Sequence, residues 1–197
     1  PKGIIIGIYD EYTNSIRIED KLFEINLRGK HNASNFLFAY AVSKELEINF
    51  KKYTKFDFKR IEGRNNIIQT KKITLLDETY NASPESIKAC VDVLIKYPGK
   101  HYIVLGSIGE LGAYSLKFHC ELIDYIKKKG IDGLIILCDF ELEVQIKNNC
   151  ILSEKMKFLN DIDKISKLVN SWVDIGDYLL IKGSRNWELE RLIPLIN

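Results

Sequence analysis

The strongest constraint on the fold is the part of the chain after residue 60, where short apolar runs alternate with helix-like segments. The runs "HYIVLG", "GLIILC" and "DYLLIKG" are almost wholly apolar. Strands of a parallel sheet have this pattern, because helices cover both of its faces. Two further strands, which a hairpin turn can join, are expected at residues 65–70 and 72–77. Helices are predicted at residues 84–97, 114–129, 161–171 and 186–195. We therefore predict an α/β fold with a mostly parallel sheet.

The first 60 residues follow a different pattern. Residues 3–28 alternate apolar and polar side chains between turn-like segments, which predicts a small antiparallel meander. A helix is expected in "NASNFLFAYAVSKEL", with Asn32 or Ser34 as its N-cap, and a weaker helix or turn at residues 50–58. The segment "EGRNN" reads as a break, so we place a domain boundary near residue 60. The opening run "PKGIIIGIYD" is already strand-like, which indicates the end of something longer.

Composition argues against a nucleic-acid-binding protein, a zinc protein and a membrane-spanning protein. The 197 residues carry a net charge of +2 without a basic arm, so nucleic acid is not a favoured partner. Four cysteines without a C-x-x-C pair, and three histidines, make a zinc site an unfavoured interpretation. We interpret the cysteines as small buried apolar residues in a reducing compartment. The apolar runs are too short for a membrane span, so we expect a soluble, cytoplasmic protein without membrane insertion.

Polar clusters follow three of the predicted strands, in "LLDETYNASPES", "IVLGSIGELG" and "LLIKGSRNWELE". Ligands of open parallel sheets bind beyond the carboxyl ends of the strands, so these clusters are candidate sites. In the first cluster, Asp77, Glu78, Tyr80 and Asn81 precede a helix N-terminus, which attracts anions. Ordinary capping and turn formation, with Ser83 as N-cap, is the alternative explanation.

The second cluster contains three glycines spaced G-x-x-G-x-x-G, namely Gly106, Gly109 and Gly112. This is not the dinucleotide-binding spacing, so a nicotinamide-binding protein is disfavoured and a flexible turn remains the simpler interpretation. His119, in the helix that follows, is interpreted as partly buried and structural.

The third cluster places Lys182, Ser184 and Arg185 at the start of the last helix. Cations at a helix N-terminus oppose its dipole unless an anion lies between them, which indicates a phosphate or carboxylate ligand. The alternative is a surface salt bridge to Glu188 or Glu190.

Together these segments resemble the Mur ligases. The matching motifs are "RGKHNASNFLFAYAVS", "EGRNN", "LLDETYNASPESIKACVDVL", "VLGSIGELGAYSLKFH" and "LLIKGSRNWELERL", in family order over residues 29–197. The resemblance implies that residues 1–60 are the C-terminal part of the central ATP-binding domain. Residues 61–197 would then be the Rossmann-like C-terminal domain of the ligase. The sequence departs from the family pattern at Ser107, commonly Asp, at Ser83, commonly Asn, and at Leu189, commonly Met.

The resemblance also implies an activity. Mur ligases are ATP-dependent, Mg²⁺-requiring enzymes of peptidoglycan precursor synthesis that activate a carboxylate as an acyl phosphate and form an amide bond. The motifs favour the member that adds D-alanyl-D-alanine to UDP-N-acetylmuramoyl-tripeptide. A related ligase with another amino-acid acceptor is one alternative, and a non-catalytic binding module from a truncated gene is another.

Site residues follow from the same resemblance. The nucleotide-binding positions are Asn32, Asn35, Arg64 and Glu78. The substrate-binding positions are Tyr80, Asn81, Lys182, Ser184 and Arg185. No catalytic or metal-binding residue is assigned. The phosphate-binding pattern G-x-x-x-x-G-K-[ST] does not occur in the chain. We therefore expect the chain to be inactive by itself and to need the missing N-terminal and central domains as partners.

Overall fold

The computed structural model describes residues 4–26, 28–48, 52–58 and 61–196. The chain forms two compact units, Pro1–Arg60 and Ile61–Asn197, called here the N-terminal and the C-terminal unit. None of the described helices combines the length and the apolar character that a bilayer crossing requires.

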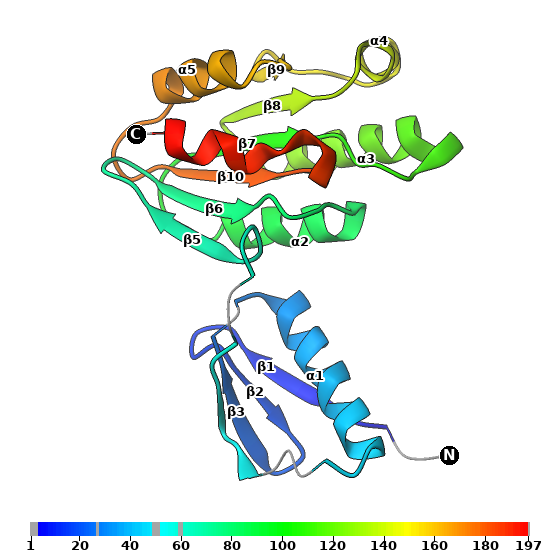
Figure 1. The fold of residues 1–197 in the computed structure, drawn as a ribbon, viewed down its shortest axis with the longest axis vertical. Helices are drawn as coiled ribbons and strands as arrows, with labels where there is room; N and C mark the ends of the chain where they lie inside the picture. Colours follow the sequence, from blue (N-terminus) through cyan, green and yellow to red (C-terminus); the bar gives the residue numbers. More distant parts are fainter. Residues whose placement is uncertain (1–3, 27, 49–51, 59–60, 197) are drawn as a thin grey trace. The chain divides into compact units, whose positions relative to one another are not determined.

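The N-terminal unit is a four-stranded sheet covered by one helix (Figure 1). Its strands, in sheet order, are β1 (Gly7–Asp10), β2 (Ser15–Ile18), β3 (Lys21–Ile25) and β4 (Lys55–Phe56). The first three form the predicted antiparallel meander, and β4 pairs with β3 in parallel. Phe23 of the sheet packs against Phe36 and Tyr40 of helix α1 (Lys30–Glu45), with ring centroids 5.6 Å apart in both pairs. These aromatic contacts form the centre of a small separate core.

Two predictions for this unit are wrong. Residues 55–56 form strand β4 rather than part of the helix or turn predicted at residues 50–58, because the Phe56 ring packs against Phe36, 5.1 Å away between centroids. Residues 50–51 of that predicted helix or turn, and Gly3 and Leu27 of the predicted meander, lie outside the described residues. Helix α1 has Gly29 as its N-cap, not Asn32 or Ser34. Asn32 lies in the first turn, where its side chain donates to the Arg28 carbonyl (2.7 Å).

The C-terminal unit is built on a six-stranded sheet in the order β5-β6-β10-β7-β8-β9. The strands are β5 (Asn66–Gln69), β6 (Thr74–Glu78), β7 (His101–Gly106), β8 (Gly133–Leu137), β9 (Met156–Phe158) and β10 (Tyr178–Lys182). All neighbours are parallel except β5, which forms an antiparallel hairpin with β6 at the sheet edge. The predicted mostly parallel sheet is confirmed, and its central strands are buried on both faces, as their apolar sequences require.

Helices cover both faces of this sheet (Figure 1). One face packs against α2 (Pro84–Leu94), α3 (Ser115–Lys128) and α4 (Phe140–Asn149). The other face packs against α5 (Ile162–Trp172) and the 3-10 helix η4 (Leu189–Leu195). Two shorter 3-10 helices, η2 (Gly112–Tyr114) and η3 (Arg185–Trp187), precede α3 and η4. Helix α2 begins as predicted, with Ser83 as N-cap in a reciprocal capping box with Ser86 and Pro84 in the first turn.

The structure differs from the predicted elements in three places. Helix α4 and strand β9 were not predicted, because only Leu142 and Ile146 of α4 are buried and β9 has three residues. The predicted helix at 186–195 is of the 3-10 type and is split at Glu188, whose φ of 46° interrupts the helical path. Pro194 removes a further backbone donor from its last turn.

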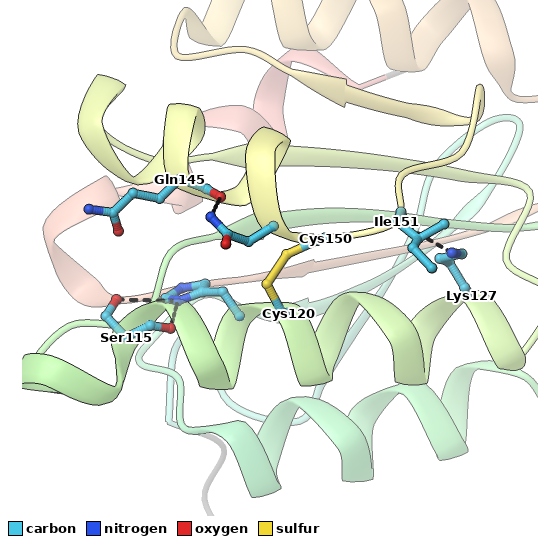
Figure 2. The surroundings of a disulfide bond; sticks show 8 residues. Ser115, Cys120, Lys127, Gln145, Cys150 and Ile151 are labelled. Carbon is cyan, nitrogen blue, oxygen red and sulfur yellow. Dashed lines mark hydrogen bonds between the residues drawn. A yellow bond between two sulfur atoms is a disulfide. The ribbon is translucent and has the colours of Figure 1, made fainter.

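The cysteines divide into two pairs. Cys90 and Cys138 are free and buried, as expected for small apolar residues. Cys120 on α3 and Cys150 after α4 form a disulfide with a Cα–Cα distance of 5.4 Å (Figure 2). The prediction that all four cysteines are reduced and buried is therefore wrong for Cys120 and Cys150. Helix α4, which was not predicted, brings these two residues together across a sequence separation of 30.

Thiol counting under denaturing conditions tests the disulfide. We expect two reactive thiols without reductant and four after reduction. Reduction should lower the free energy of unfolding of the C-terminal unit by up to about 3–4 kcal/mol, because it removes a cross-link from the unfolded chain. Both Trp172 and Trp187 lie in this unit, so tryptophan fluorescence in urea reports its unfolding. Four thiols in unreduced protein from an aerobic preparation would contradict the pairing.

Candidate functional site

The carboxyl ends of β6, β10 and β7 form one edge of the sheet, where the three polar clusters meet. Glu78 is the register partner of Lys182, and Lys182 is the register partner of Leu105 on the other side. Strands β6 and β7 lead to helices on one face, whereas β10 leads to η4 on the other. The segment after β10 therefore leaves the sheet on the opposite face from the segments after its two neighbours, β6 and β7. Open α/β sheets bind ligands at such a switch point. This edge is the candidate site, called here the switch-point edge.

A buried ion pair joins β6 to β10 at this edge. The Lys182 ammonium lies 3.7 Å from Glu78 Oε2 and donates to the Asn81 backbone carbonyl at 3.0 Å. The other Glu78 oxygen accepts from the Asn65 backbone N–H at 3.0 Å. Burial raises the pKa of Glu78 above its ordinary value, and the charge of Lys182 opposes that rise. The pair ties together three segments, β6, β10 and the loop before β5.

The thiol of Cys90, on α2, lies against this pair and hydrogen-bonds to Glu78. Burial, with the negative charge of Glu78, raises the pKa of Cys90 to about 12, so the thiol stays protonated. Sequence reasoning missed this contact, because Cys90 was interpreted only as an apolar core residue. Its position one helical turn after the buried Ile87 indicated burial but not the acidic neighbour.

The loop around Gly63 docks onto the tip of β6. The Tyr80 backbone N–H donates to the Gly63 carbonyl at 2.9 Å, and Gly63 has a φ of 72°. A Cβ on Gly63 would lie 2.7 Å from the Tyr80 backbone nitrogen, so only glycine fits this approach. The docked loop places the Arg64 guanidinium 4.2 Å from the centroid of the Tyr80 ring, a cation–π geometry. Two predicted site residues, Arg64 and Tyr80, are thus brought together on the surface.

On the other side of β10, the glycine cluster after β7 meets the segment after β10. A Cβ on Gly106 would lie 2.7 Å from Trp187 Cδ1, so the indole packs directly on the backbone of the β7 end. The Trp187 indole N–H donates to both the carbonyl and the hydroxyl of Ser107, at 3.2 and 3.1 Å. The Ser184 hydroxyl faces Gly109, 3.3 Å from the place of a Cβ there. Trp187 was not predicted to belong to this edge.

The other predicted residues of the edge have local partners. Asp77 is buried and accepts from the backbone and the hydroxyl of Thr79, so it stabilises the strand tip. The Asn81 side chain is exposed. Arg185 forms an ion pair with Glu190 at 3.1 Å, which confirms the salt-bridge alternative for that cation. The charge of Arg185 therefore does not by itself require an anionic ligand.

Asn32 and Asn35 belong to the N-terminal unit. They are one turn apart at the start of α1, where Asn35 is exposed and Asn32 is half-buried. Within the described residues, no group of three or more His, Cys, Asp and Glu side chains is arranged to hold a metal ion.

Replacing Lys182 tests the ion pair. We expect Lys182→Met to lower the free energy of unfolding by about 2–4 kcal/mol at pH 8, because it leaves the buried Glu78 carboxylate without its cation. The deficit should shrink as the pH falls through the pKa of Glu78, since the neutral acid needs no counter-charge. Urea titrations at several pH values measure this. The exposed Lys157→Met on β9 is the control, and an equal loss in both variants would contradict the pairing.

Replacing Gly63 tests the docked loop. Gly63→Ala should destabilise the C-terminal unit by about 2–4 kcal/mol, because the methyl group meets the Tyr80 backbone and the φ is unfavourable. Gly130→Ala is a matched control, since Gly130 has a φ of 74° with nothing within 4 Å of the added Cβ. That variant should lose only about 1–2 kcal/mol, the cost of the backbone conformation alone. Indistinguishable losses would show that the loop is not docked.

Comparison with known proteins gives the relatives of this chain. The family model of the Mur ligase glutamate ligase domain matches residues 63–185. The UDP-N-acetylmuramoyl-tripeptide–D-alanyl-D-alanine ligase of Synechocystis sp. is 33% identical over 163 residues, which cover 81% of this chain and 36% of that protein. The ligase of the same name from Escherichia coli is 30% identical over 174 residues, or 85% of this chain and 37% of that protein.

A solved structure agrees with these sequence relatives. The MurF ligase from Thermotoga maritima in complex with ADP has a TM-score of 0.74 and 27% identity, covering 98% of this chain and 45% of that one. The chain thus spans less than half the length of these relatives. The family model covers most of the C-terminal unit, including the loop at Gly63, the segments after β6 and β7 and the start of the segment after β10, up to Arg185. This chain belongs to the Mur ligase family.

Proposed function

We propose that the chain is the C-terminal portion of an ATP-dependent ligase that joins D-alanyl-D-alanine to UDP-N-acetylmuramoyl-tripeptide. The switch-point edge carries this proposal, because three motifs far apart in the sequence converge there in a Mur ligase C-terminal domain. The sequence relatives from Synechocystis and Escherichia coli bear the name of this activity. The ADP in the Thermotoga structure supports a nucleotide as co-substrate.

In the proposed reaction, the terminal carboxylate of the tripeptide attacks the γ-phosphorus of ATP, and ADP leaves. The amine of D-alanyl-D-alanine, having lost a proton, then attacks the carbonyl carbon of the acyl phosphate. The amide bond forms and inorganic phosphate leaves. Mg²⁺, when bound, neutralises phosphate charge. No residue of this chain is proposed as its ligand.

The proposed residue roles divide between the two co-substrates. The nucleotide side consists of Asn32, Asn35, Arg64 and Glu78. The acceptor side consists of Tyr80, Asn81, Lys182, Ser184 and Arg185. Arg64 is the best placed for direct contact, because its guanidinium is exposed, supported by the Tyr80 ring and able to pair with phosphate oxygens. Lys182 and Glu78 are buried against each other, so we propose that they act mainly by holding the Asn81 and Asn65 backbones in place.

The phosphate cradle is proposed to come from polypeptide outside this chain. The N-terminal unit supports this proposal, because it exposes a groove of about 600 Å³ along α1, lined by apolar residues that include Leu37, Phe38, Val42 and Leu46. Phe38 is 72% exposed and Leu46 65% exposed. Large exposed apolar surfaces mark contact sites for protein, ligand or membrane, and further polypeptide of the same ligase is the occupant proposed here. We accordingly assign residues 1–60 to a central ATP-binding domain and residues 61–197 to the C-terminal domain.

The place of the reaction is proposed to be the cytoplasm, where ATP is available. The Cys120–Cys150 disulfide is more typical of oxidising compartments, so its occupancy in freshly lysed cells bears on this assignment.

Activity measurements test the proposal. The isolated chain should release no phosphate from Mg-ATP, because it lacks the phosphate-binding loop. The complete ligase should release ADP only when the tripeptide and D-alanyl-D-alanine are both present. Single amino acids offered as acceptors should give no turnover. Turnover with a single amino acid instead of the dipeptide would favour a related Mur-type ligase. Phosphate release by the isolated chain would contradict its assignment as a partial enzyme.

A substitution in the complete ligase tests the role of Arg64. Arg64→Ala should lower kcat by about 100- to 1000-fold, because a cation aimed at transferring phosphoryl oxygens is lost. The control is Arg191→Ala on η4, an exposed arginine paired with Glu188 3.4 Å away, which should change kcat less than about twofold. Similar rates for Arg64→Ala and the unaltered ligase would remove Arg64 from the site.

A further inference from the structure

His119 is a buried polar residue that the proposed reaction does not use. It lies on α3 with 2% of its surface exposed. One ring nitrogen, Nδ1, lies 2.7 Å from the Ser115 carbonyl oxygen one turn earlier. The other, Nε2, lies 3.0 Å from the backbone nitrogen of Ile108, which is in the loop after β7. The ring thus bridges α3 and the glycine cluster of the switch-point edge.

The Ser115 hydroxyl also lies 3.4 Å from Nδ1, but the two shorter contacts define the protonation of the ring. A carbonyl oxygen can only accept, so Nδ1 carries the proton, and the backbone N–H can only donate, so Nε2 is the acceptor. Burial lowers the pKa of His119, which favours this neutral form. A cationic ring would place two donors against each other at Ile108. His119 therefore acts as a fixed acceptor aimed at one backbone amide.

The Ile108 amide belongs to the loop after β7, and this loop contacts the segment after β10 at the switch-point edge. Residues 107–111 connect β7 to η2, and Glu110 in this loop has a φ of 61°. Ser107, directly before Ile108, accepts the Trp187 indole N–H. Gly109, directly after it, faces the Ser184 hydroxyl. Any shift of the Ile108 backbone would therefore move both contacts with the segment after β10.

We propose that His119 is a positioning residue: by accepting from the Ile108 N–H it holds the loop at residues 107–111 in place and so sets the contacts of Ser107 and Gly109 with Trp187 and Ser184. The consequence for the acceptor side of the ligase rests on the proposed function. The positioning itself does not, because it is a property of the C-terminal unit alone.

A purely space-filling role is the competing explanation, and two variants separate them. His119→Gln keeps a hydrogen-bond acceptor near the place of Nε2, whereas His119→Leu has similar bulk without any acceptor. If the ring only fills space, the leucine variant should preserve the loop at least as well as the glutamine variant. If the acceptor matters, only the glutamine variant should preserve it.

The experiment uses the 197-residue chain with Trp172→Phe as background, so that Trp187 is its single tryptophan. NMR spectra give the exchange rate of the Ile108 amide and the indole N–H resonance of Trp187. We expect Ile108 exchange to rise about tenfold or more in His119→Leu, with a displaced indole resonance. In His119→Gln both should stay close to the parent values. An unchanged indole resonance and Ile108 exchange rate in His119→Leu would overturn the proposal.

A measurement on the parent protein keeps the test decisive if the leucine variant does not fold. Nitrogen-15 spectra of His119 report its tautomer, and we expect the proton on Nδ1 with Nε2 unprotonated. A proton on Nε2 at neutral pH would overturn the proposal, since the Ile108 amide would have no acceptor. Neither readout requires ATP or peptide, so failure of the proposed ligase activity would leave the result for His119 intact, and the reverse also holds.

Discussion

The ion pair between Lys182 and Glu78 is the interaction on which the switch-point edge depends. It joins the end of β6 to the end of β10, a strand that the chain adds last and inserts between β6 and β7. Two charges removed from water stabilise a fold only when each has the other and further hydrogen bonds complete their shells. Here the Asn65 and Asn81 backbones supply those bonds. Strand pairing, loop position and charge balance are thus coupled at one point.

Around the ion pair, buried contacts hold the loops of the switch-point edge, and exposed side chains lie over these contacts. Close backbone approaches at Gly63 and Gly106 hold the flanking loops, and His119 holds the loop after β7 from behind. The Arg64 guanidinium and the Tyr80 ring contact each other and remain exposed to solvent. Binding groups placed on loops over a rigid scaffold are the usual arrangement of α/β enzymes. The fold of the C-terminal unit and its membership of the Mur ligase family both agree with the proposed ligand site at the switch-point edge.

Much of the fold could be predicted because the signals are local. The apolar runs of β7, β8 and β10 and the Ser83-Pro84 start of α2 depend only on neighbouring residues. Helix α4 was missed because only two of its residues face the core, although Asp139 caps it by accepting from the Leu142 backbone N–H. The 3-10 geometry after β10 and the pairing of Cys120 with Cys150 depend on packing between distant segments, which periodicity does not report.

The sequence by itself determined the class of fold, the three polar clusters at strand ends and the resemblance to Mur ligases. All of these depend only on the types of residue and their order along the chain. Only the tertiary structure decided which polar residues are buried at the strand ends and which are exposed on the surface. Lys182 and Arg185 look alike in the sequence, three positions apart. One is buried against Glu78, and the other is exposed and paired with Glu190. The physical reason is strand order: β10 lies between β6 and β7, so its last residue is enclosed by both neighbours, whereas a residue three positions later has left the sheet.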